Sequence, residues 1–260
     1  MQRVRKLLLA CAFAATSALV ASGAQAAVVT LNSITAAWVN IDPASISAIN
    51  NGTTNPMIRW GNPATSRGQS GYDFDSATPP AIAVNIPPSP TPDFVLGEFI
   101  HRNNPITGTT LSSVTLQVTA DISVDGNNIG TRDFFFDFTH EETPNGADPC
   151  ANGEPNGGSG VNRNGCADIV TITFNDLSEN FMVGNDLYTL FVRGFQDGGN
   201  LVEGFETVEK KNNKADIIAF LEVDTRPGTP GQEIPEPGTL GLMAIGLLGM
   251  GAVLRRRRHS

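Results

Sequence analysis

The stretch from Ser112 to Val124 constrains the fold of this 260-residue chain most strongly. Apolar side chains occupy every second position, and polar ones separate them: Val114, Leu116, Val118, Ala120, Ile122 and Val124. A period of two is that of an extended strand, and one apolar face is typical of an antiparallel sheet that covers a core. Asp125-Gly126 then supplies a hairpin turn. Phe134, Phe136 and Phe138 alternate in the same way, so the sequence predicts two paired strands here.

Other extended segments follow the same pattern. We expect strands near residues 28–41, 57–60, 69–74, 169–174, 187–195 and 217–223, separated by turns rich in Gly, Pro and Asn. The proline-rich stretch 78–92 fits an edge strand or an extended connector, because proline removes a ladder donor. Residues 207–214 are expected to form one or two helical turns. We predict an all-β fold, a β-sandwich or jelly roll of about ten short antiparallel strands.

The N-terminus has the pattern of a secretory signal. Three basic residues precede an apolar run over 7–20, and Ala24-Gln25-Ala26 has the small-x-small pattern of a signal-peptidase site. We predict a signal peptide over 1–26, an exported β-sandwich domain over 27–225 and a Pro/Gly linker over 226–234.

The segment 235–260 combines three sorting features. Pro235-Glu236-Pro237 precedes an uncharged run over 238–254, which as a helix is about 25 Å long and spans a bilayer only marginally. The four arginines at 255–258 are expected to stay cytoplasmic. We predict a transmembrane helix over 238–254 within a sorting signal.

This tail resembles the PEP-CTERM signal of exported proteins from Gram-negative bacteria. The resemblance implies processing by exosortase near the triplet, after signal peptidase has acted at the other end. It also implies an inner-membrane intermediate, a final place at the cell surface or outside the cell, and association with exopolysaccharide or biofilm.

The net charge of the exported part of the chain limits the kinds of partner that it can bind. Of 17 Lys and Arg, three lie in the predicted signal peptide and four in the tail, and of 26 Asp and Glu only Glu236 lies in those segments. The ten basic and 25 acidic residues that remain give a net charge of −15. Nucleic acid is excluded as a partner, because its binding requires Lys and Arg against phosphate.

Two cysteines remain after Cys11 leaves with the signal peptide. In an oxidising compartment we predict a disulfide between Cys150 and Cys166. A metal site there would need more sulfur or a nearby histidine, and none lies between the two cysteines.

No motif in the domain predicts catalysis or a bound cofactor. His140-Glu141-Glu142 lacks the second histidine of a metalloprotease helix, since Pro144 stands at that position. The segment 121–126 imitates a calcium loop without its closing glutamate. We therefore predict no metal site and no cofactor. The one alternative left open is calcium binding by Asp73 and Asp75, or by the loop that carries Asp148 and Asp168.

The segment 97–106 resembles a second family, the Thr-His-x-Asn PEP-CTERM group and the related choice-of-anchor K domain. His101 and Asn103 match its naming motif, whereas Ile100 replaces the threonine. Further shared features are Trp60-Gly61 with Pro63, Gln69-Ser70-Gly71, Glu142-Thr143-Pro144-Asn145, Cys150 and Cys166 with Asp168, and Tyr188-Thr189 with Gly194-Phe195. The resemblance implies no established enzymatic activity.

The candidate polar cluster is His101, Asn103, His140, Glu142 and Asn145. It either binds a ligand or forms an internal hydrogen-bond network, and the second reading is favoured because buried polar groups must be paired. Two functions follow: a non-catalytic surface or matrix protein, or a secreted glycan hydrolase that pairs Glu142 with Asp137 or Asp168.

Overall fold

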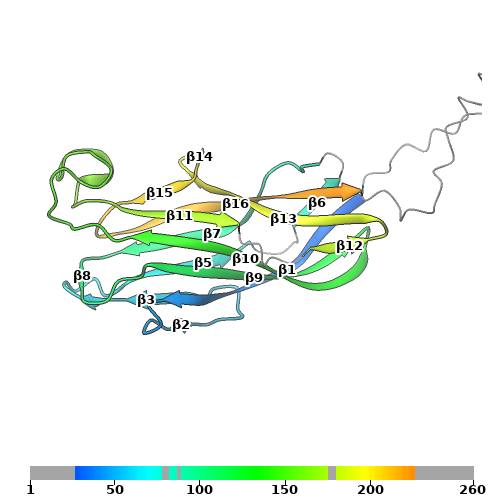
Figure 1. Cartoon of the computed structure of the whole chain (residues 1–260), viewed down its shortest axis with the longest axis horizontal. Helices are drawn as coiled ribbons and strands as arrows, with labels where there is room; N and C mark the ends of the chain where they lie inside the picture. Colours follow the sequence, from blue (N-terminus) through cyan, green and yellow to red (C-terminus); the bar gives the residue numbers. More distant parts are fainter. Residues whose placement is uncertain (1–26, 78–81, 87–88, 175–179, 226–260) are drawn as a thin grey trace, which may run out of the picture.

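The computed structural model describes residues 27–77, 82–86, 89–174 and 180–225 (Figure 1). The predicted signal peptide with Ala24 and Ala26, the linker, and the tail with Pro235, Glu236, Pro237 and the proposed helix 238–254 lie outside these residues. Within the described part of the chain, no helix has the length and apolar character needed to cross a membrane.

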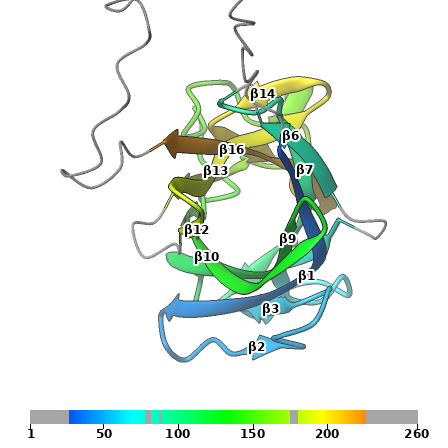
Figure 2. The same cartoon turned by 90° about the vertical axis from the view of Figure 1, so that its right-hand side faces the viewer.

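The domain is all-β, as predicted, and its two main sheets are antiparallel and pack face to face (Figure 1). The six-stranded sheet has the order β15 (Gly204–Thr207), β11 (Asp168–Phe174), β10 (Asn127–Glu141), β9 (Ser113–Val124), β1 (Ala27–Asp42) and β6 (Ile82–Ile86). The eight-stranded sheet has the order β12 (Phe181–Val183), β13 (Asp186–Asp197), β16 (Lys211–Thr225), β7 (Phe94–Asn103), β5 (Ser70–Ser76), β3 (Met57–Trp60) and β2 (Ala48–Ile49), with β14 (Asn200–Val202) beside β13. A separate pair joins β4 (Asn62–Pro63) to β8 (Ile106–Thr107). Seen from the end, both sheets curve around the core (Figure 2).

The hairpin predicted from the alternating pattern is confirmed. The six apolar residues of β9 are all buried, and so are Phe134, Phe136 and Phe138 of β10. Asp125 and Gly126 have φ values of 50° and 78°, which is the left-handed conformation that a two-residue turn of this kind needs at both positions. The proline-rich stretch contributes β6, which lies at the edge of its sheet, as expected.

The strands are more numerous and several are longer than the sequence pattern indicates. Sixteen strands are present in the described residues, and β10 extends over 15 residues, well beyond the alternating phenylalanines that predicted it. The β1–β9 register shifts between Leu31 and Ser33. Inward-facing positions therefore move from Val29 and Leu31 to Ile34 and the residues beyond it. The simple alternation ends at this bulge although the pairing continues.

The helical prediction for residues 207–214 is wrong. β15 ends at Thr207 and β16 begins at Lys211, with a tight turn between them. The Asn213 side chain holds this turn, since it accepts from the Val208 N–H at 2.9 Å and donates to the Val208 carbonyl at 2.9 Å. A side chain that satisfies both backbone groups outweighs the weak helical spacing of one Glu–Lys pair.

Aromatic side chains fill the space between the two sheets. Trp38 of β1 and Phe138 of β10 have ring centroids 5.4 Å apart, and Phe138 lies 5.3 Å from Phe99 of the opposite sheet. Tyr72 of β5 lies 4.7 Å from Phe99. This cluster extends toward the end of the sandwich that carries the loop between β10 and β11.

Candidate functional site

A cluster of buried polar side chains occupies that end of the core, between the two sheets. His101 comes from β7 of the eight-stranded sheet, while His140 and Asp168 come from the end of β10 and the start of β11 in the other sheet. His101 and Asp168 have no exposed surface and His140 is 8% exposed. The two imidazole rings are perpendicular, with centroids 5.1 Å apart. The candidate histidines therefore face the core.

The hydrogen bonds of His101 fix the state of its imidazole. Nδ1 lies 2.9 Å from the hydroxyl of Thr207, and that hydroxyl donates its hydrogen to the carbonyl oxygen of Asp168 at 3.2 Å. A hydroxyl has one hydrogen, so Nδ1 must be the donor to it. Nε2 then carries a lone pair, and this buried atom has no hydrogen-bond partner among the described residues. Burial, together with the neighbouring His140, lowers the pKa of His101 well below its ordinary value, which agrees with a neutral ring.

His140 is held on one side by Tyr72. The Tyr72 hydroxyl lies 2.6 Å from Nδ1, while Nε2 lies 3.4 Å from a carboxylate oxygen of Glu142. Burial, and then the charges of Asp168 and Glu142, raise the pKa of Tyr72 well above its ordinary value, so its hydroxyl keeps its proton. His140 Nε2 thus points toward the Glu142 carboxylate, which also lies close to Asp168.

One of the two carboxylate oxygens of Asp168 is likewise held by hydrogen bonds from the protein. Oδ1 accepts the backbone N–H of Thr143 at 2.9 Å and its hydroxyl at 3.3 Å, whereas the buried Oδ2 has no partner among the described residues. Burial, and then the charge of Glu142, raise the pKa of Asp168 to about 8. Burial likewise raises the pKa of Glu209 to about 7, and Glu142 adds to the rise. The Glu209 carboxylate is buried, and a hydrogen bond from the Asn145 side chain opposes this rise.

These side chains form two overlapping groups that could hold a metal ion. In the first group, ligand atoms of His101, His140 and Asp168 all lie within 4.8 Å of one another. In the second, ligand atoms of Glu142, Asp168 and Glu209 do the same. Asp168 belongs to both. The site therefore concentrates nitrogen and oxygen ligands in a region that is shielded from water.

The other predicted residues support this region. Asn103 is buried and donates to the carbonyl oxygen of Thr207 at 3.0 Å. Asn145 lies next to Glu209 across Gly165, since a Cβ at Gly165 would lie 2.9 Å from Asn145 Oδ1 and 3.2 Å from Glu209 Cγ. The structure thus brings all five predicted polar residues into one region.

Three members of the site were not predicted as site residues: Tyr72, Thr207 and Glu209. The alternation of Ser70, Tyr72 and Phe74 gave a signal for Tyr72, because it places a phenol on the inner face of a strand. No comparable pattern marks Thr207, at the end of β15, or Glu209, in the turn that follows it, where helical turns were expected.

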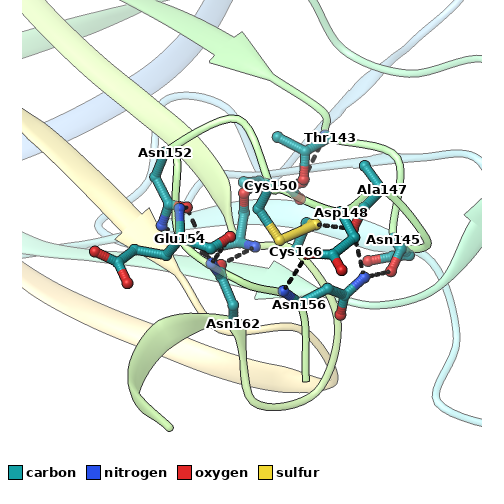
Figure 3. The surroundings of a disulfide bond; sticks show 12 residues. Thr143, Asn145, Ala147, Asp148, Cys150, Asn152, Glu154, Asn156, Asn162 and Cys166 are labelled. Atoms are coloured by element: carbon teal, nitrogen blue, oxygen red, sulfur yellow. Dashed lines mark hydrogen bonds between the residues drawn. A yellow bond between two sulfur atoms is a disulfide. The ribbon is translucent and has the colours of Figure 1, made fainter. Parts of the chain in front are cut away.

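A disulfide and several hydrogen bonds connect distant parts of the loop over residues 142–167 (Figure 3). Cys150 and Cys166 form a disulfide. Asn162 accepts from the backbone N–H of Ala167 at 2.9 Å, and Asn156 donates to the carbonyl oxygens of Asn145 and Ala147 at 2.9 and 2.8 Å. These bonds fix the segment that positions Glu142, Thr143 and Asp168.

The carboxylates left open for calcium have other partners. Asp73 forms ion pairs with Arg59 and with Arg102, the second at 2.6 Å. Asp75 accepts from the side chain of Asn55 at 2.7 Å. Asp148 accepts from the backbone N–H of Asn156 at 3.3 Å.

A second polar feature lies on the outer face of the eight-stranded sheet. Asn212, Arg102, Gly71 and Arg59 are successive register partners on β16, β7, β5 and β3, so they form one row across the sheet. Beside this row is a groove of about 530 Å³. Its lining residues are Arg59, Arg67, Gly68, Gln69, Arg102, Asn104 and Asn212. We call it the arginine groove.

Comparison with known proteins locates a family feature in the tail. Residues 233–258 match the PEP-CTERM protein-sorting motif, which includes Pro235, Glu236, Pro237 and the arginine cluster. No curated protein matches the chain. The motif confirms the sorting signal that the sequence predicted, whereas the narrower resemblance to the Thr-His-x-Asn group stays a prediction. The chain therefore carries a PEP-CTERM sorting signal at residues 233–258, which supports export and surface localisation through exosortase.

Proposed function

We propose that the exported domain is a non-catalytic surface or matrix protein that holds an acidic exopolysaccharide in the arginine groove. The observation that carries this proposal is the presence of three arginines around one groove, in a domain whose net charge is otherwise strongly negative. Guanidinium groups bind carboxylates through paired hydrogen bonds, which suits the uronic acid units of an acidic polysaccharide.

The charges within the groove leave room for such a ligand. Asp73 pairs with both Arg59 and Arg102 and neutralises one of these two positive charges. The guanidinium of Arg67 makes no ion pair or hydrogen bond with the described residues, and Arg67 is exposed. Asn104, Gln69 and Asn212 line the same groove with amide groups that can bond to sugar hydroxyls.

Burial of the carboxylates supports the non-catalytic part of the proposal. A glycan hydrolase is favoured by one observation, the close approach of Glu142, Asp168 and Glu209. Asp168 and Glu209, however, have no exposed surface. A glycosidase needs two carboxylates on either side of a sugar ring, so these side chains would have to be uncovered before a glycan reached them.

Binding to polysaccharides of different charge tests the proposal. We expect the exported protein to bind a polyuronate such as alginate and not neutral dextran, with affinity that falls as salt rises. Arg67→Ala should weaken binding about five- to tenfold, consistent with the loss of one charge-assisted hydrogen bond. Arg163→Ala, which removes an exposed arginine in another part of the domain, is the matched control. Equal binding to both polymers, or no effect of Arg67→Ala, contradicts the proposal.

The hydrolase alternative has its own test. The exported protein and Glu142→Gln are incubated with acidic and neutral polysaccharides, and new reducing ends are counted. We expect none from either protein. Turnover that disappears in Glu142→Gln would favour the hydrolase.

A further inference from the structure

The polar cluster between the sheets contains buried ligand atoms that protein groups leave without partners. They are His101 Nε2 and Asp168 Oδ2. A buried polar atom without a hydrogen bond destabilises the folded state, and more so when it belongs to a charged group. A common partner for the two atoms, which belong to the same cluster, would satisfy both.

The supporting hydrogen bonds show which kind of partner fits. Each of the three principal side chains uses one polar atom for a protein contact and directs the other into the cluster: His101 bonds to Thr207, His140 to Tyr72, and Asp168 to Thr143. A metal-binding histidine in proteins likewise donates its second N–H to an outer-shell acceptor, which fixes the ring and its tautomer. Thr207 performs this role for His101, and the Tyr72 oxygen can accept the Nδ1 hydrogen of His140.

We propose that His101 Nε2, His140 Nε2, Asp168 Oδ2 and a Glu142 oxygen bind one divalent transition-metal ion of the zinc type. The ion would connect β7 of the eight-stranded sheet to β10 and β11 of the six-stranded sheet. This differs from the sequence-based expectation of no metal site, which considered only the surroundings of the cysteines and local motifs.

The distances agree with a compact tetrahedral centre. Two ligands each about 2.1 Å from a tetrahedral zinc ion lie about 3.4 Å apart. The distance between His140 Nε2 and Glu142 Oε2 is 3.4 Å. The atoms of His101, His140 and Asp168 lie within 4.8 Å of one another, so small side-chain movements bring them to the same spacing.

The charges and ligand types favour a zinc-type ion over calcium or magnesium. Two imidazole nitrogens suit zinc and its neighbours in the first transition series, whereas calcium and magnesium prefer all-oxygen sites. The carboxylates of Asp168 and Glu142 balance the charge of a divalent cation. Within the described residues, Asp168 forms no ion pair with Lys or Arg, so a bound cation would be the positive partner that favours the ionised form of this buried carboxylate.

The site is closed, which assigns a structural role to the ion. Zinc in structural sites has four protein ligands, whereas catalytic zinc keeps one position for water. Here Glu142 takes the fourth position, and its side chain is only 17% exposed. A carboxylate oxygen of Glu209 lies within 4.8 Å of those of Asp168 and Glu142, but Glu209 is not required as a ligand.

Metal analysis of the exported protein, expressed from the full chain, tests the proposal. After removal of bound metal with a chelator, the protein is titrated separately with Zn²⁺, Mn²⁺, Ca²⁺ and Mg²⁺. We expect one Zn²⁺ per chain, and a rise in the unfolding temperature on the order of 5 °C when Zn²⁺ is well above its dissociation constant. Co²⁺ in place of Zn²⁺ should give the visible spectrum of a tetrahedral nitrogen and oxygen site.

Variants then assign the ligands. Asp168→Asn and His140→Gln should weaken Zn²⁺ binding by more than the roughly 10–100-fold that loss of an outer-shell partner costs. Glu98→Gln is the matched control, because Glu98 lies on β7 and pairs with Lys214 at the surface. Circular dichroism checks that each variant is folded. The Co²⁺ spectrum of the parent tests the ligand geometry without any substitution, so it does not depend on the folding of a variant.

Three outcomes would overturn the proposal. The first is a parent protein that takes up no Zn²⁺ and whose unfolding temperature does not respond to it. The second is equal Zn²⁺ binding by the parent, Asp168→Asn and His140→Gln. The third is a preference for Ca²⁺ or Mg²⁺ over Zn²⁺, which would contradict the assigned ligand chemistry.

Discussion

His101 of one sheet is bonded to Thr207 of the other: imidazole Nδ1 donates to the threonine hydroxyl over 2.9 Å. Asn103 donates to the carbonyl oxygen of the same threonine at 3.0 Å, and the hydroxyl donates to Asp168. One side chain from the end of β15 therefore orients His101 and links β7 to β11. No local sequence pattern around Thr207 indicates that it orients His101.

Thr207→Val should destabilise the domain, because the isosteric side chain removes the acceptor of a buried N–H. We expect the free energy of unfolding to fall by about 1–3 kcal/mol in urea denaturation, measured without metal. In the proposed metal centre, Zn²⁺ affinity should fall about 10–100-fold, since Thr207 orients His101 from the outer shell. Thr207→Ser keeps the hydroxyl and is the control. Unchanged stability in Thr207→Val would contradict this role.

Tyr72→Phe should remove the partner of His140 Nδ1 while it keeps the aromatic packing. We expect a loss of about 1–3 kcal/mol in the free energy of unfolding, because His140 Nδ1 is left buried without a partner. Tyr188→Phe is the matched control. Tyr188 is also largely buried, stacked on Phe181 with ring centroids 5.0 Å apart, and its hydroxyl bonds to no described residue. Equal effects of the two substitutions would argue against a specific Tyr72–His140 interaction.

Removal of the disulfide should destabilise the loop that positions Glu142 and Asp168. The two cysteines are 16 residues apart, and closing a loop of about 15 residues is worth roughly 3 kcal/mol in the chain-entropy model. The double variant Cys150→Ala, Cys166→Ala should therefore unfold at a lower urea concentration than the parent. A reducing agent should lower the stability of the parent and leave the double variant unchanged. Peptide mapping without reduction should recover Cys150 joined to Cys166.

Gly71→Ala should disturb the arginine groove. Gly71 lies beneath the Arg59 side chain, and an added Cβ would lie 2.6 Å from Arg59 Cδ and would also collide with the Ile58 carbonyl oxygen. Arg59 must then move away from the Tyr72 carbonyl, to which it donates at 3.0 Å. We expect a loss of about 1–3 kcal/mol in stability and weaker alginate binding.

Gly146→Ala is the matched control for that change. A Cβ at Gly146 meets no atom within 4 Å, and its φ lies outside the left-handed region. Its stability and alginate binding should equal those of the parent. If Gly71→Ala also behaved like the parent, close packing of Arg59 over Gly71 would have no role in the groove.

The sorting motif makes a prediction about processing. Mass spectrometry of the exported protein should show a chain that begins at Ala27 and has lost the arginine cluster. Simultaneous replacement of Pro235, Glu236 and Pro237 by alanine should leave the tail intact and retain the chain in the membrane fraction. Gln232 lies just before the matched motif, which covers residues 233–258, so the Gln232→Ala variant should be processed like the parent. An intact tail on exported parent protein would contradict exosortase processing.

Much of the fold could be predicted because strand patterning is local. Side chains of β9 and β10 alternate without interruption from one face to the other, and the turn residues between them have the required conformation. Strand β1 could be predicted in extent but not in phase, since its bulge after Leu31 depends on pairing with β9. The turn before β16 was misread because Asn213 stabilises it through contacts that no local spacing indicates.

The sequence by itself determined the all-β class, the central hairpin, the pair of cysteines and the sorting tail, because each depends on residues close together in the chain. Only the tertiary structure decided which distant side chains meet. His101, His140, Asp168 and Thr207 come from four strands, and the pairing of β11 with β10 and β15 brings the last three together opposite β7. Burial between the sheets then decided their chemistry, since it removes water and leaves His101 Nε2 and Asp168 Oδ2 without a hydrogen-bond partner among the described residues.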